Sequence, residues 1–88
     1  MINLSEYLQD EDCISFLDEI RLALSEDYLN EVYLSYKGKT LSIEPVDGKV
    51  VVFYGDTRSE FENVDELFLH FILDGKTFIE QIKNIEYN

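Results

Sequence analysis

The chain is predicted to be an α+β protein, because its hydrophobic period changes twice along 88 residues. Apolar side chains recur at helical spacing in the first third, alternate along the middle third, and return to helical spacing in the last third. Glycine-containing dipeptides separate the alternating runs. We expect a small antiparallel meander of three to four strands, covered by an N-terminal helix and two short C-terminal helices, in the order α-β-β-β-(β)-α-α.

The N-terminal helix is expected from about Asp12 to Leu24. Residues at positions i, i+3, i+4, i+7 and i+11 give it one apolar side, formed by Cys13, Phe16, Leu17, Ile20 and Leu24. Asp10 or Asp12 is the expected N-cap, because a carboxylate there accepts free backbone N–H groups and suits the helix dipole.

Three strands are expected between Leu29 and Tyr54, where β-branched and aromatic residues are dense. Lys37-Gly38 separates the first two, and Asp47-Gly48 separates the second from the third. Asp-Gly predicts a two-residue type I′ turn, since both of its residues need a positive φ. The run Val50 to Tyr54 is apolar on both faces and is therefore expected to be central or covered on both sides. The segment Thr57 to Glu62 is the expected fourth strand.

Two C-terminal helices are expected from two capping patterns. Asn63 followed by Glu66 resembles a capping box, and the helix that it begins should end at Asp74-Gly75. Thr77 with Glu80 repeats the pattern before a closing helix that contains Phe78, Ile79, Ile82 and Ile85.

The length and the apolar fraction of 45% indicate one domain, residues 1–88, that closes a single core. The core should contain the residues on the apolar faces of these elements: Phe16, Leu17, Ile20, Leu34, Ile43, Val52, Leu67, Phe68, Phe71, Phe78 and Ile82.

The composition indicates a cytoplasmic protein. The single cysteine, Cys13, cannot form an internal disulfide or a cysteine-based metal cage. The N-terminal residues lack the pattern of a signal peptide, and no apolar run reaches the length of a membrane span. One Ala, eight Ile and no Trp are typical of an AT-rich bacterial gene.

Charge is the most unusual property of the sequence. It has 19 acidic residues and 7 basic ones, a net charge of −12. Nine of the acids lie in the first 36 residues, where Arg21 is the only cation. Nucleic acid is therefore not an expected direct partner, because phosphate binding requires clustered Lys and Arg.

No local motif indicates catalysis or a cofactor. His70 has no marked nucleophile beside it, and the acids before Cys13 disfavour its thiolate. The run Asp10-Glu11-Asp12 lacks the glycine and the distal glutamate of a calcium-binding loop. We expect neither an enzyme nor a metal site.

The sequence favours a small protein-binding domain that docks on a basic partner, as an inhibitor, an immunity or antitoxin protein, or a nucleic-acid mimic would. The alternative is a structural or regulatory module, such as a homodimer, whose acids serve only solubility. The expected binding residues are the N-terminal acids and one tyrosine that alternates away from the core: Asp10, Glu11, Asp12, Asp18, Glu19, Glu26, Asp27 and Tyr33.

Overall fold

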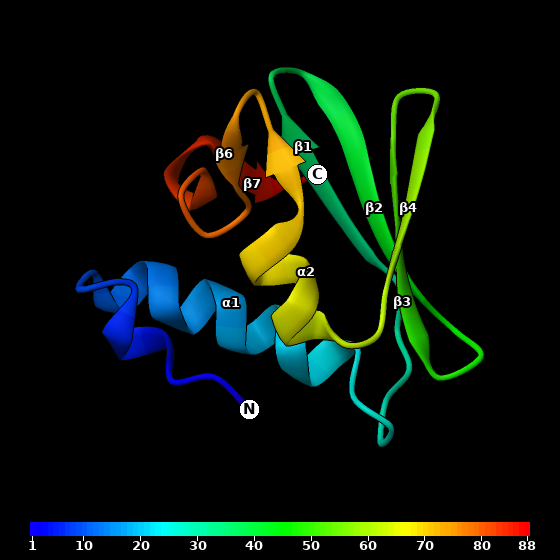
Figure 1. Cartoon of the computed structure of the whole chain (residues 1–88), viewed down its shortest axis with the longest axis horizontal. Helices are drawn as coiled ribbons and strands as arrows, with labels where there is room; N and C mark the ends of the chain where they lie inside the picture. Colours follow the sequence, from blue (N-terminus) through cyan, green and yellow to red (C-terminus); the bar gives the residue numbers. More distant parts are fainter.

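The computed structural model describes residues Met1–Asn88 and has an α+β architecture in two layers (Figure 1). One layer is a five-stranded antiparallel sheet with strand order β4-β3-β2-β1-β7. The other contains both helices and a two-stranded hairpin, all on the same side of the sheet. The strands are β1 (Val32–Tyr36), β2 (Lys39–Val46), β3 (Lys49–Tyr54), β4 (Thr57–Phe61), β5 (Ile72–Leu73), β6 (Lys76–Thr77) and β7 (Ile85–Tyr87), and the helices are α1 (Glu11–Ala23) and α2 (Val64–His70), with 3₁₀ turns η1 (Leu4–Glu6) and η2 (Ile82–Asn84).

Helix α1 begins where its capping residue predicts. The Asp10 carboxylate accepts the backbone N–H of Asp12 at 2.9 Å and that of Cys13 at 3.4 Å. Leu17 and Ile20 are fully buried on the helix side that packs on the core. Phe16, expected in the core, is only half-buried, because it lies at the margin of α1 with its ring edge-on to Tyr87.

The first four strands form the predicted meander, and its turns have the predicted backbone. Asp47 and Gly48 have φ values of 50° and 79°, so the β2–β3 turn has positive φ at both central residues. β3 is central, between β2 and β4. Val50 and Val52 belong to the core, whereas Val51 is buried on the helix-free side of the sheet.

The expected end of the first C-terminal helix was wrong. Helix α2 begins at the predicted cap, where the Asn63 side chain accepts the backbone N–H of Glu66 at 2.9 Å, but it ends at His70. Asp74-Gly75 is instead the turn between β5 and β6, with φ values of 52° and 84°. A glycine with positive φ serves equally in a helix C-cap and in a hairpin turn, so the dipeptide alone does not distinguish them.

The predicted closing helix was also wrong, although its capping box forms. The Thr77 hydroxyl accepts the N–H of Glu80 at 3.2 Å, and the Glu80 carboxylate accepts the N–H of Thr77 at 2.8 Å. The chain then makes only turns and η2 before β7 pairs antiparallel with β1. Pairing satisfies the backbone groups along the edge of β1 and buries Ile85, which a helix would not do.

One cluster of buried side chains joins the sheet to both helices and to the C-terminal turns. Every residue expected in the core except Phe16 is buried. No helix has the length and the apolar character that crossing a bilayer requires.

Two polar contacts fasten the periphery to this core. The guanidinium of Arg21 donates to Asp65 at 2.9 Å and to the carbonyl oxygen of Ile2 at 3.1 Å, which holds the N-terminal segment against α1 and α2. In the turn between β5 and β6, the Asp74 carboxylate accepts a hydrogen bond from the hydroxyl of Tyr36 and forms an ion pair with the ammonium of Lys37, each at 2.7 Å. This contact links the tip of the β5–β6 hairpin to the tip of the β1–β2 hairpin, and the two tips lie near each other in Figure 1.

Candidate functional site

The exposed side of α1 carries a continuous acidic stripe. Positions i, i+1, i+4, i+7, i+8 and i+11 fall on one side of a helix, and here they are Glu11, Asp12, Ser15, Asp18, Glu19 and Leu22, all of them exposed. We call these six residues the acidic stripe. Four of the six are carboxylates, so α1 presents a one-sign surface to solvent.

The only cation of α1 does little to neutralise this stripe. Arg21 pairs with Asp18 at 3.2 Å, but it also reaches inward to Asp65, and its side chain is only 17% exposed. Glu19 accepts the hydroxyl of Tyr87 at 2.7 Å, which leaves its negative charge in place.

The predicted binding residues do not form a single patch. Asp10 is occupied in capping α1, and Glu11 and Asp12 lie beside it in the first turn. Glu26 and Asp27 are exposed at the opposite end, in the turn that follows α1. Of the predicted residues, the acidic stripe brings together four: Glu11, Asp12, Asp18 and Glu19.

Tyr33 stands apart from the stripe. Its side chain is 52% exposed, while its neighbours Val32 and Leu34 are buried on the other face of β1, as their alternation predicts. Tyr33 and Glu19 both border a groove beside α1, but the Tyr33 ring points to the helix-free side of the sheet.

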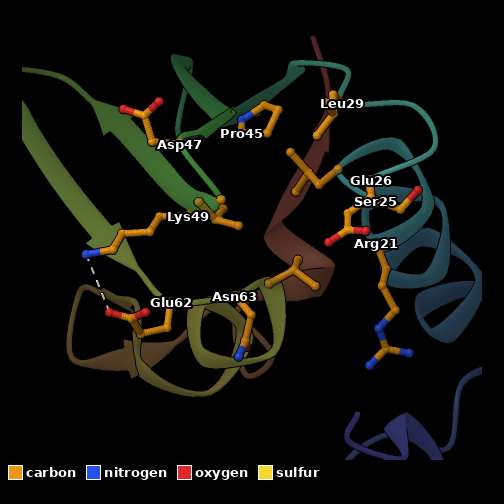
Figure 2. Close-up of a pocket in the computed structure, with 13 residues that line it drawn as sticks. Arg21, Ser25, Glu26, Leu29, Pro45, Asp47, Lys49, Glu62 and Asn63 are labelled. Atoms are coloured by element: carbon orange, nitrogen blue, oxygen red, sulfur yellow. Dashed lines mark ion pairs between the residues drawn. The ribbon is translucent and has the colours of Figure 1, made fainter.

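A first groove lies at the C-terminal end of α1 and has a volume of about 510 Å³. We call it the hairpin groove, because the β2–β3 hairpin faces the end of α1 across it (Figure 2). Its apolar lining comes from Leu24, Leu29, Pro45, Val50 and Val64.

The charged groups around the hairpin groove are three carboxylates and two cations, and neither cation is free. Lys49 is paired with Glu60 at 3.3 Å and with Glu62 at 3.6 Å. Arg21 contributes its stem to the lining, but its guanidinium points away from the cavity (Figure 2). Glu26 and Asp47 form no such pair and add negative charge to the rim.

Leu29 at the hairpin groove has a strained backbone. Its φ is 48°, in the left-handed region that a bulky residue seldom adopts, and its side chain is 60% exposed. Bonds from its own N–H to Ser25 O at 2.8 Å and from the N–H of Asn30 to Ala23 O at 2.7 Å hold the turn in place. A strained residue that displays an apolar side chain beside a groove is a candidate contact residue. Position 29 holds a leucine, so no glycine or asparagine indicated a left-handed backbone there.

A second groove of about 450 Å³ lies on the other flank of α1, between its C-terminal half, the start of β1 and the end of β7. We call it the tyrosine groove. Ile20 and Val32 contribute apolar lining. On the helix-covered side of the sheet, the hydroxyl of Tyr87 donates to Glu19 at 2.7 Å. The hydroxyl of Tyr33 donates to Glu31 on the opposite side, because Tyr33 alternates with Leu34, the residue that is paired with Tyr87.

Both tyrosine hydroxyls stay protonated well above neutral pH. Burial, and next the hydrogen bond to Glu19, raises the pKa of Tyr87 to about 12. The hydrogen bond to Glu31 is the main cause of the raised pKa of Tyr33. Each hydroxyl therefore remains a donor, and each glutamate is the acceptor.

Sequence reasoning did not select Glu31 and Tyr87 for this site. Tyr87 follows the last residue expected in the closing helix, Ile85, and only its pairing in β7 brings it beside α1. Glu31 directly precedes β1 and was one acid among many in an acidic segment.

Two other groups considered from the sequence have ordinary surroundings. His70 is exposed at the end of α2, 3.1 Å from a carboxylate oxygen of Glu66. Cys13 is half-buried against the core, and burial followed by the charge of Asp10 raises the pKa of its thiol. No group of three or more His, Cys, Asp or Glu side chains is arranged to hold a metal ion.

Comparisons with protein-family models, with curated proteins and with solved structures gave no match to this chain.

Proposed function

We propose that this chain is a small protein-binding domain that docks on a basic partner protein through the acidic stripe of α1, acting as an inhibitor or immunity-type protein in the cytoplasm. The observation that supports the proposal is the stripe itself, four exposed carboxylates on one side of a helix whose only arginine is directed largely inward.

The physical basis is electrostatic steering. A concentrated one-sign charge attracts an oppositely charged surface over about a Debye length, roughly 8 Å at physiological salt, and so raises the association rate. Exposed charges contribute little to folding stability. Their concentration on one helix is thus more readily explained by association than by stability.

The grooves on either side of α1 would add short-range contacts to this long-range attraction. Charged rims steer an encounter, whereas affinity comes mainly from a few well-packed anchor residues. The exposed side chains of Leu22 on the acidic stripe and of Leu29 at the hairpin groove are suited to that second role.

The test is charge reversal on the stripe. A partner is first isolated by pull-down from lysate at low salt and identified, and its association rate constant is then measured with the Asp12→Lys/Asp18→Lys/Glu19→Lys variant. We expect association to slow by at least about tenfold, while the melting temperature confirms that the variant is folded.

A matched control reverses three acids elsewhere: Asp56 in the β3–β4 turn, Glu66 on α2 and Glu86 on β7. Both triple variants have the same net charge, so only the position of the charges differs. Equal slowing in the two variants would indicate a general effect of net charge, and undiminished association of a folded stripe variant would reject the stripe as the docking surface.

A homodimeric structural module is the second candidate, and the free edges of the sheet favour it. β4 and β7 each have a strand neighbour on one side only, and an unpaired edge can pair with a second copy. Sedimentation at low and high salt separates the two proposals, because an edge-paired dimer should persist at high salt whereas a charge-driven complex should weaken.

A further inference from the structure

Two residues of opposite charge stand on the outer strand β4. This strand has β3 on one side and no strand on the other. Glu60 is the partner of Val51, which is buried on the helix-free side of the sheet, and Arg58 lies on that same side two residues away. The side chains of Arg58 and Glu60 are 52% and 42% exposed. An exposed pair of opposite charges therefore marks the open edge of the sheet.

Arg58 and Glu60 also carry the backbone groups of β4 that face this open edge. The two-residue loop Gly55-Asp56 joins β3 to β4, so the flanking residues Tyr54 and Thr57 exchange both of their backbone hydrogen bonds. Hydrogen-bonded and non-hydrogen-bonded pairs alternate along an antiparallel ladder, so every second residue from Thr57 is bonded to β3. The N–H and C=O groups of Arg58 and Glu60 consequently point away from β3.

These positions make β4 complementary to itself in one register. When two copies of an antiparallel edge meet, residues with outward backbone groups must lie opposite one another. Registers that place Arg58 opposite Arg58, or Glu60 opposite Glu60, put like charges together, which is unfavourable. The register centred on Ser59 places Arg58 opposite Glu60, and two-fold symmetry repeats that pair. It is also the register that overlaps the whole of β4, Thr57–Phe61.

The other open edge, β7, lacks this complementarity. It has three residues, Ile85–Tyr87, and Glu86 is the one that is paired with Ser35 of β1. Two copies of β7 centred on Glu86 would place this exposed carboxylate opposite itself. A contact between β4 of one copy and β7 of another is heterologous and would continue into further copies instead of closing.

We propose that β4 binds a second copy of this chain, antiparallel and centred on Ser59, so that the two five-stranded sheets form one continuous sheet. The occupant is a second copy because charge complementarity is met by the strand itself, and a two-fold contact between identical edges closes. This inference defines the interface of the homodimer considered above. It does not depend on the acidic stripe, which shares no residue with β4.

Charge exchange across the interface tests the proposal. Dimerisation of the full chain is measured by sedimentation equilibrium at about 0.15 M salt and up to about 1 mM protein. Arg58→Glu places glutamate opposite glutamate, and Glu60→Arg places arginine opposite arginine, so each variant alone should dimerise at least about tenfold more weakly. An equimolar mixture restores opposite charges in both pairs and should associate within about threefold of the original protein. Melting temperatures confirm that both variants are folded.

A matched pair of controls makes the same changes of net charge away from β4. Lys76→Glu on β6 and Glu66→Arg on α2 alter exposed positions. Each should dimerise within about threefold of the original protein, and mixing them should bring no gain. Equal weakening by the controls would show an effect of net charge and reject the β4 interface.

A cysteine at the symmetry axis tests the register directly. In the proposed register Ser59 lies opposite its own copy in a non-hydrogen-bonded pair, with Cα atoms about 4.5 Å apart, which a disulfide can bridge. In a Cys13→Ser background, Ser59→Cys should therefore form a disulfide-linked dimer under mild oxidation. Thr57→Cys, on the same side of the strand, is the control, because its two copies would be about 14 Å apart along the strand and should not link.

Three results would overturn the inference: a chain that stays monomeric at about 1 mM, a mixture of the two charge variants no tighter than either alone, or equal cross-linking at positions 57 and 59. These failures are separable from failure of the proposed function. If the β4 dimer is rejected but charge reversal on the acidic stripe still slows association with the partner, the stripe proposal stands. If the folded stripe variant associates normally, the stripe proposal fails whatever the sedimentation shows.

Discussion

At Gly48, in the β2–β3 turn, adding a side chain should cost stability because of the backbone conformation that the turn requires. Its φ is 79°, and no atom lies within 4 Å of the position that a Cβ would take. A substitution there meets no clash, so its cost is the backbone conformation alone. Gly48→Val should lower the free energy of unfolding by more than about 1 kcal/mol, because a β-branched residue resists positive φ.

Urea unfolding measures this change, and Gly48→Asn is the matched control, since asparagine tolerates the left-handed region. A Val variant as stable as the original protein would contradict the turn assignment.

Leu29 also has a positive φ, which strains a residue that carries a Cβ, and its side chain is exposed beside the hairpin groove. Left-handed backbone costs an ordinary residue about 1–2 kcal/mol, which is partly offset by the larger unfolded-state entropy of glycine. Leu29→Gly should therefore leave the free energy of unfolding unchanged or raise it by about 0.5 kcal/mol, while weakening partner capture. Chemical unfolding combined with a binding assay checks both effects. Marked destabilisation would show that Leu29 has a structural role instead.

Arg21 has a structural role that its place among exposed acids conceals. It and Asp65 are each only 17% exposed in their ion pair. Removing one partner leaves the other partly buried without its counter-charge, so Arg21→Gln should lower the free energy of unfolding by about 2 kcal/mol.

Arg58→Gln is the control for Arg21, because Arg58 is half exposed in its pair with Glu60. An exposed pair contributes little, and the expected change in urea unfolding is below about 0.5 kcal/mol. Similar losses in the two variants would mean that the Arg21 contact does not fasten the N-terminal segment.

Among the elements, the two hairpins β1–β2 and β5–β6 are joined by a titratable contact. The hydrogen bond from Lys37, and next that from Tyr36, lowers the pKa of Asp74 in the folded chain. Its contribution to stability is therefore present above the unfolded aspartate pKa of about 3.9 and is lost as the pH falls through the lower folded value.

Asp74→Asn should accordingly flatten the decline in unfolding free energy below about pH 4. Denaturant unfolding at a series of pH values measures the slope, with Asp56→Asn as the control at an exposed position in the β3–β4 turn. An unchanged acid limb in the Asp74 variant would show that the link between the hairpin tips contributes nothing.

At the scale of the whole molecule, the net charge of −12 is confined to a particle with a radius of gyration of 11.9 Å. Mutual repulsion of like charges destabilises a compact state, and salt screens it. Raising sodium chloride from about 0.05 M to about 0.5 M should therefore raise the melting temperature, while it weakens association with a basic partner. Thermal unfolding across this range tests the first effect. A melting temperature that falls with salt would indicate that the ion pairs outweigh the repulsion.

Local signals in the sequence determined the elements whose stabilising contacts are also local. Asp10 caps α1 through bonds to residues two and three positions away, and the Asp47-Gly48 turn depends only on its own backbone. The alternation of apolar and polar residues likewise identified the meander. The net charge follows directly from the composition, because it does not depend on the fold.

Tertiary structure decided the C-terminal third and the grooves. Thr77 and Glu80 form their capping box, but the free edge of β1 recruits Ile85–Tyr87 as a strand, and long-range pairing overrides that local signal. The same pairing brings Tyr87 to Glu19, 68 positions away in the sequence. The sequence by itself therefore determined that the N-terminal helix is acidic, whereas only the fold determined which aromatic rings and apolar surfaces stand beside it, because those contacts depend on how the sheet closes and not on any local pattern.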